Sequence, residues 1–164
     1  MTSNYGTVAL LEPPPPSLDP AQPGSAQERP TRVLLVEDDP DAAVLAMSSL
    51  CDDHSEPFCV EWVSTLWKAM KRLEEPGVDV ILLDLGLPEL TGYRSFRAIE
   101  AAAAHTVPVV ILTADDRMDT RRMILEFGAS DYLLKGYVTS PQLRTSLRRA
   151  AELGWPKREP KLYS

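Results

Sequence analysis

Five short apolar runs alternate with helix-like stretches along the chain, and this alternation restricts the chain to very few folds. The apolar runs are 32–36, 59–63, 79–83, 107–112 and 131–134. The helix-like stretches are about 40–50, 64–74, 93–104, 116–127 and one that begins at 140. Strict alternation of this kind predicts an α/β fold, a doubly wound parallel sheet with helices on both faces. Ligands of such sheets bind beyond the carboxyl ends of the strands, so functional residues are expected there.

Local signals give the expected helix boundaries. Asp39 stands before Pro40, which predicts an N-cap followed by proline at the first helical position. Ser64 is the expected N-cap of the second helix, and Gly128 is expected to end the fourth.

The residues outside the alternating region predict two tails. The first 30 residues contain 7 of the 15 prolines and few large apolar side chains, so they cannot bury enough surface to order themselves. We expect a disordered proline-rich tail with polyproline II character over 1–30, one domain over 31–153 and a short C-terminal tail over 154–164. A proline-rich docking site is the alternative interpretation of the first tail.

Charge and composition exclude several classes of protein. The net charge is −7, which opposes direct binding to nucleic acid or to an anionic membrane surface. No apolar run approaches the roughly 20 residues that span a bilayer, and the N-terminus has no positive signal region. We therefore expect a cytoplasmic protein with reduced thiols. Cys51 and Cys59 are expected to be small buried side chains, and Trp62 and Trp67 to pack in the core or on a helix surface.

Acidic and basic side chains follow the apolar runs at the positions where the strands should end. Glu37 and Asp38 follow the first run, Asp84 follows the third, and Thr113 and Lys135 follow the fourth and fifth. Carboxylates packed together repel one another, and a hard divalent cation relieves this repulsion. An oxygen-only set suits Mg²⁺, with Mn²⁺ as an alternative. The neighbouring Asp39, in contrast, is expected only to cap a helix.

Four segments of the chain resemble the receiver domain of bacterial two-component response regulators, in particular the single-domain chemotaxis type. They are Val36-Glu37-Asp38-Asp39, Leu83-Asp84-Leu85-Gly86-Leu87-Pro88, Leu112-Thr113-Ala114 and Asp131-Tyr132-Leu133-Leu134-Lys135. The resemblance covers about residues 31–153. It implies a flavodoxin-like sheet with strand order 2-1-3-4-5. It also implies transfer of a phosphoryl group to an aspartate from a histidine kinase or a phosphotransfer protein.

The resemblance also implies roles for individual residues. Asp84 matches the phosphoacceptor and a metal ligand. Asp38 matches a direct metal ligand, Glu37 a ligand acting through water, and Gly86 a ligand through its backbone carbonyl. Glycine departs from the family here, because a larger residue is common at position 86 and can gate or orient the water that attacks the phosphoryl group.

Three further residues match the switch of the family. Lys135 matches the lysine that pairs with a phosphoryl oxygen, Thr113 the hydroxyl that follows the phosphoryl group, and Tyr132 the aromatic switch residue. We expect Thr113 to move inward and to vacate space into which Tyr132 rotates. Gly136 departs from the family, in which proline is common after the lysine.

The leading hypothesis is a stand-alone receiver that is not an enzyme and signals through an unknown protein target. The surface that binds this partner is expected on the fourth helix, fifth strand and fifth helix. The alternative is that a homodimer forms through the same face. Arg144, Arg148 and Arg149 are expected to form a solvated face there, or a partner surface. Alternatives for the whole chain are a phospho-independent scaffold on the same fold and a small-molecule hydrolase or phosphotransferase. Flavin binding is disfavoured, because no phosphate-cradling loop follows the first strand.

Overall fold

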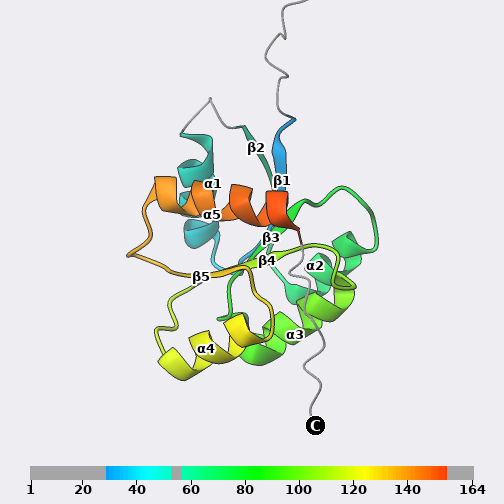
Figure 1. The fold of residues 1–164 in the computed structure, drawn as a ribbon, viewed down its shortest axis with the longest axis vertical. Helices are drawn as coiled ribbons and strands as arrows, with labels where there is room; N and C mark the ends of the chain where they lie inside the picture. Colours follow the sequence, from blue (N-terminus) through cyan, green and yellow to red (C-terminus); the bar gives the residue numbers. More distant parts are fainter. Residues whose placement is uncertain (1–28, 53–56, 155–164) are drawn as a thin grey trace, which may run out of the picture.

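A computed structural model describes residues 29–52 and 57–154, which form a five-stranded parallel sheet between two layers of helices (Figure 1). The strands are β1 (Thr31–Val36), β2 (Phe58–Val63), β3 (Val80–Leu83), β4 (Val109–Thr113) and β5 (Asp131–Leu134). Their order in the sheet is β2-β1-β3-β4-β5, and every neighbouring pair is parallel. The expected fold class and strand order are confirmed.

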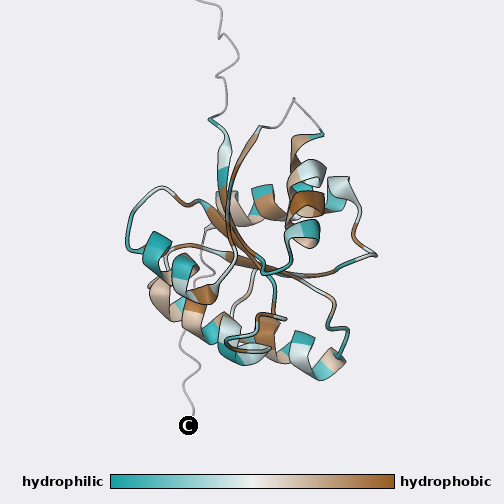
Figure 2. Ribbon diagram, turned by 180° about the vertical axis from the view of Figure 1, so that it is seen from behind, coloured by the Kyte–Doolittle hydropathy of each residue, from teal (hydrophilic) through white to brown (hydrophobic). Residues whose placement is uncertain are grey.

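Two helices cover one face of the sheet and three cover the other (Figure 1). The helices are α1 (Pro40–Cys51), α2 (Leu66–Leu73), α3 (Tyr93–Ala102), α4 (Met118–Glu126) and α5 (Ser140–Leu153). The core on the α1 and α5 side is built on Val33 and Leu35 of β1, whereas Leu34 and Val36 belong to the core under α2, α3 and α4. Because neighbouring residues of a strand point to opposite faces, one apolar run supplies both cores. Figure 2 shows the resulting mostly brown strands between helices along which teal, white and brown segments alternate.

The register of the strands aligns their carboxyl ends. Val36 of β1 pairs with Leu83 of β3, and Thr113 of β4 pairs with Leu134 of β5. The backbone N–H of Asp84 donates to the carbonyl of Val36 at 3.0 Å, and that of Lys135 donates to the carbonyl of Thr113 at 2.9 Å. The residues that follow the strands therefore start from one edge of the sheet.

Side-chain caps explain where the helices begin. The Asp39 carboxylate accepts from the backbone N–H of Asp41 at 2.9 Å, and Pro40 is the first helical residue, as expected. The expectation for α2 is wrong by one residue. Thr65, not Ser64, is the N-cap, because Thr65 has the extended backbone and its hydroxyl accepts from the N–H of Lys68 at 3.2 Å.

Helix α4 begins at Met118, two residues later than expected. The delay has a local cause, because the backbone N–H of Arg117 donates to the Asp115 carboxylate at 3.0 Å and Arg117 remains extended. The end of α4 is as predicted: Phe127 is the C-cap, and Gly128 follows with φ +111°.

Both cysteines are exposed, so the prediction that they are buried is wrong. Phe58 and Val60 of the edge strand β2 pack against the α1 and α5 core, which turns the intervening Cys59 outward. The predicted tails, 1–30 and 154–164, lie outside the described residues except for 29, 30 and 154. Across 29–52 and 57–154, no helix has both the length and the apolar character needed to cross a bilayer.

Candidate functional site

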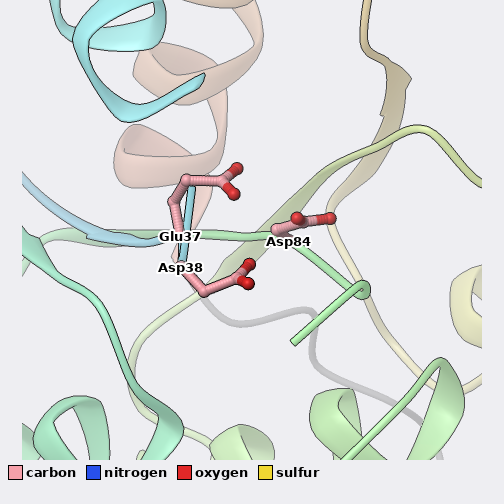
Figure 3. Close-up of side chains that lie close together, drawn as sticks. All are labelled: Glu37, Asp38 and Asp84. Carbon is pink, nitrogen blue, oxygen red and sulfur yellow. The ribbon is translucent and has the colours of Figure 1, made fainter. Parts of the chain in front are cut away.

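Three carboxylates meet at the carboxyl edge of the sheet, where β1 and β3 end side by side (Figure 3). Glu37, Asp38 and Asp84 each place one carboxylate oxygen within 4.8 Å of the others. Glu37 and Asp84 are buried, whereas Asp38 is exposed. The sequence separates these residues by almost fifty positions, and the pairing of β1 with β3 removes that separation.

The Lys135 ammonium joins the two buried carboxylates. Its Nζ lies 2.6 Å from Glu37 Oε2 and 2.9 Å from Asp84 Oδ2. Burial raises the pKa of the Glu37 carboxyl above its usual value; the Lys135 hydrogen bond acts against this, and the Asp84 charge adds to it. Burial also acts to lower the pKa of Lys135, but hydrogen bonds to Glu37 and Asp84 outweigh it and leave that pKa raised. The ammonium is therefore a fixed positive charge within a net negative site.

The donor set fits a hard divalent cation. Every candidate protein ligand is an oxygen, and three carboxylates face one ammonium, so the cluster is left with unbalanced negative charge. Gly86 adds a backbone contact, since its N–H donates to Asp84 Oδ1 at 3.1 Å. This hydrogen bond holds one oxygen of Asp84 while Lys135 holds the other.

Thr113 and Tyr132 are connected through the backbone of Asp115. The backbone N–H of Asp115 donates to Thr113 Oγ1 at 3.3 Å, and the Tyr132 hydroxyl donates to the Asp115 carbonyl at 2.7 Å. Tyr132 is only 2% exposed, and burial, followed by the nearby Asp115 charge, raises its pKa to about 12. Tyr132 therefore already lies inside in this conformation and needs no inward rotation to reach the interior.

The sequence pattern did not reveal three contributors to the site. Trp62 of β2, 38% exposed, donates from Nε1 to the Glu37 carbonyl at 2.8 Å. Asp115 carries the contacts just described, and it also binds Arg117 at the rim of the site. The Asp115 and Arg117 positions directly follow the Thr113 segment, so their opposite charges two residues apart were the available signal.

The arginine stripe expected on α5 is divided between two surfaces. Arg144 is partly buried and donates from Nη1 to the carbonyl of Ser49 at 2.8 Å, which turns it toward α1. Arg149 is exposed and lines a cavity of about 520 Å³ together with Tyr132 and Tyr137. The expectation of one solvated face is therefore wrong, because α5 packs against both α1 and the β5 side.

Comparisons with known proteins agree on one family. Residues 33–148 match the model of the response regulator receiver domain. The chain is 34% identical over 137 residues to the transcriptional regulatory protein TrcR of Mycobacterium tuberculosis, covering 82% of this chain and 52% of TrcR. It is 33% identical over 121 residues to the transcriptional regulatory protein BasR of Escherichia coli, covering 72% of this chain and 53% of BasR. The chain thus spans about half the length of these curated relatives.

Solved structures extend the likeness to the fold. The receiver domain of a sensor histidine kinase from Pseudomonas aeruginosa, with a magnesium ion in its active site cleft, is 31% identical with a TM-score of 0.63. That match covers 75% of this chain and 98% of the solved domain. The receiver domain of a Luxo repressor protein from Vibrio parahaemolyticus is also 31% identical, with a TM-score of 0.63. That match covers 76% of this chain and 94% of the solved chain. The matched family model, these likenesses and the observed strand order lead to one conclusion: the chain belongs to the response regulator receiver domain family of two-component signalling.

Proposed function

We propose that this receiver takes a phosphoryl group on Asp84 from a histidine kinase or phosphotransfer protein and passes the signal to a protein partner. The supporting observation is the position of Asp84, which is buried among Glu37, Asp38 and Lys135 at the carboxyl edge of the sheet. Lys135 and the Gly86 N–H each hold one oxygen of Asp84, and the carboxylate still lines the open cavity at this edge, where a phosphodonor can reach it. Receiver domains in general are signalling domains that act with such kinases and are not classed as enzymes.

Receiver domains bind Mg²⁺ at an acidic pocket, and we assign its ligands here to this chain's own oxygens. Asp38 and Asp84 would hold the ion directly, the Gly86 carbonyl would be a third protein ligand, and Glu37 would act through water. When bound, the ion supplies positive charge beside the phosphoryl oxygens. Mn²⁺ has the same preference for oxygen ligands and is expected to replace it.

The proposed transfer is a displacement at phosphorus. A carboxylate oxygen of Asp84 forms the new P–O bond, the P–N bond of the phosphohistidine breaks, and the imidazole leaves with that electron pair. The Lys135 ammonium, already 2.9 Å from Asp84 Oδ2, stabilises the negative oxygens of the product. The Thr113 hydroxyl accepts from Asp115 in this conformation, so its own proton remains to be donated to a phosphoryl oxygen.

The proposed response reaches the partner surface through Asp115. A hydrogen bond from Thr113 to the phosphoryl group changes the contact between Thr113 and the backbone of Asp115, whose carbonyl holds the Tyr132 hydroxyl. Tyr132 and Tyr137 line the cavity on the α4, β5 and α5 side. We therefore assign the surface of α4, β5 and α5 to the downstream protein or to a second copy of the chain. Cytoplasmic location is part of the same proposal.

A phosphodonor experiment tests the assignment. Acetyl phosphate with Mg²⁺ should add the mass of one phosphoryl group to the wild-type chain and none to Asp84→Asn. Asp116→Asn is the matched control, because it makes the same change at an exposed carboxylate and should be phosphorylated normally. Incorporation that persists in Asp84→Asn would remove the assignment, and absence of incorporation in the wild type would favour the phospho-independent scaffold.

A further inference from the structure

Arg117 stands at the rim of the open space above Asp84. A cavity of about 310 Å³ is lined by Asp84, Gly86, Thr113, Asp115 and Arg117, among other residues. Gly86 contributes no side chain to this space, whereas a Cβ at this position would lie beside the acceptor carboxylate, 3.4 Å from Asp84 Oδ2. An anion attached to Asp84 would therefore share this cavity with the arginine.

The guanidinium of Arg117 is held by the Asp115 carboxylate. Nε lies 2.9 Å from Oδ1 and 3.1 Å from Oδ2, and Nη2 lies 2.6 Å from Oδ2. This contact raises the pKa of Arg117 and lowers the pKa of Asp115. The Arg117 side chain is 72% exposed, so it can move without disturbing the core. The position of Asp115 is fixed, because its backbone N–H donates to Thr113 and its carbonyl accepts from the Tyr132 hydroxyl.

Phosphorylation would change the charge balance of this region. Glu37 and Asp38 contribute one negative charge each, and a phosphorylated Asp84 contributes two. Lys135 and a divalent cation contribute three positive charges together, so one negative charge is left uncompensated. Among the described residues that line the cavity, Arg117 carries the positive charge that is not already paired with Glu37 or Asp84.

We propose that Arg117 is a reserve cation for the phosphorylated site: Asp115 holds it at rest, and the phosphoryl group on Asp84 draws its guanidinium across the cavity. This inference rests on the proposed function, since it needs Asp84 to carry the anion. A guanidinium offers several N–H donors in a fixed plane, which suits two oxygens of one phosphoryl group. Arg117 is a positioning and binding residue in this proposal and takes no part in bond formation.

Beryllofluoride, a phosphoryl mimic, provides the test in the presence of Mg²⁺. Its dissociation constant should rise about fivefold in Arg117→Ala, the size expected for one exposed ionic contact. Arg117→Lys should retain part of the affinity, because it keeps the charge and loses the planar fork. Asp115→Asn should bind more tightly than the wild type, because the guanidinium is no longer held. Arg122→Ala is the matched control, an equal loss of charge on an exposed residue of α4, and it should bind as the wild type does.

Side-chain NMR separates contact from a general electric field. The Arg117 Nε–H signal, assigned by its absence in Arg117→Lys, should shift when beryllofluoride binds. An unchanged signal, an unchanged affinity in Arg117→Ala, or an equal loss in Arg122→Ala would each overturn the reserve-cation proposal. Weaker binding by Asp115→Asn would overturn it as well, since Asp115 would then be helping the bound state. If the wild type and Asp84→Asn bind beryllofluoride alike, the failure lies in the proposed function itself.

Discussion

Replacement of Lys135 by methionine should destabilise the chain and, at the same time, make its stability depend on metal and pH. The variant leaves Glu37 and Asp84, with side chains only 3% and 9% exposed, without their ammonium. Removing one partner of a buried ion pair costs about 3–5 kcal/mol. The Lys135 side chain is 26% exposed, so we expect the lower end, a loss of about 3 kcal/mol in the free energy of unfolding at neutral pH.

The pH dependence has a defined sign. The pKa of Glu37 is raised above 4.5 in the folded chain, so the folded state holds its proton at a higher pH than the unfolded state does. The stability linked to this proton is complete below about 4.5 and is lost as the pH rises through the folded pKa. Loss of the Lys135 hydrogen bond should raise that pKa further. The deficit of the variant should therefore shrink as the pH falls from neutral toward 4.5.

Urea unfolding followed by circular dichroism measures this deficit, with and without Mg²⁺. Mg²⁺ should narrow the deficit, because the ion binds the folded state and supplies the missing positive charge. Lys71→Met is the matched control, since Lys71 lies 2.8 Å from Glu74 on the surface, and its loss should change stability little. A deficit below about 1 kcal/mol at neutral pH, or one that grows on acidification, would refute the reasoning.

Three further variants test separate parts of the site. Asp38→Ala should weaken Mg²⁺ binding at least tenfold, about 1.4 kcal/mol, read by the fluorescence of Trp62; an unchanged titration would contradict its role as ligand. Thr113→Ala should still be phosphorylated, but amide NMR with beryllofluoride should show smaller shifts around Tyr132 and Tyr137; shifts equal to those of the wild type would exclude the route. Tyr132→Phe should remove an absorbance step near pH 12. Because that pKa is raised from 10.0, the stability linked to Tyr132 should be complete below 10 and decline above it; an identical alkaline titration in the variant would refute the assignment.

The sequence predicted the fold well because apolar burial decides it. Val80–Leu83 is wholly apolar and had to be covered on both faces, which fixed the parallel sheet. The residues of the acidic site could also be predicted, since strand ends in such a sheet share an edge. The place of Asp84 at the end of a buried apolar strand is enough to mark it as a candidate site residue.

Contacts between side chains of distant elements were beyond the sequence pattern. Nothing in the spacing of β2 indicates that Trp62 bonds the Glu37 carbonyl, because this depends on the pairing of β1 with β2. The direction of Arg144 likewise depends on how α5 packs against α1. The shift of the α2 cap to Thr65 reflects a competition between adjacent hydroxyl residues that only the backbone conformation decides.

The bare backbone at Gly86 has a consequence for how long a signal lasts. An acyl phosphate survives only as long as water is kept from its phosphorus, and here the cavity over Asp84 has no side chain at position 86 to cover it. We expect the phosphoryl group proposed on Asp84 to be hydrolysed quickly once the supply of phosphodonor stops. Gly86→Leu should lengthen the half-life of the phosphorylated chain, measured after the phosphodonor is removed. An unchanged half-life would assign the rate of hydrolysis to another residue. The phosphorylated fraction of such a chain would follow the current supply of phosphodonor and would not depend on its earlier level.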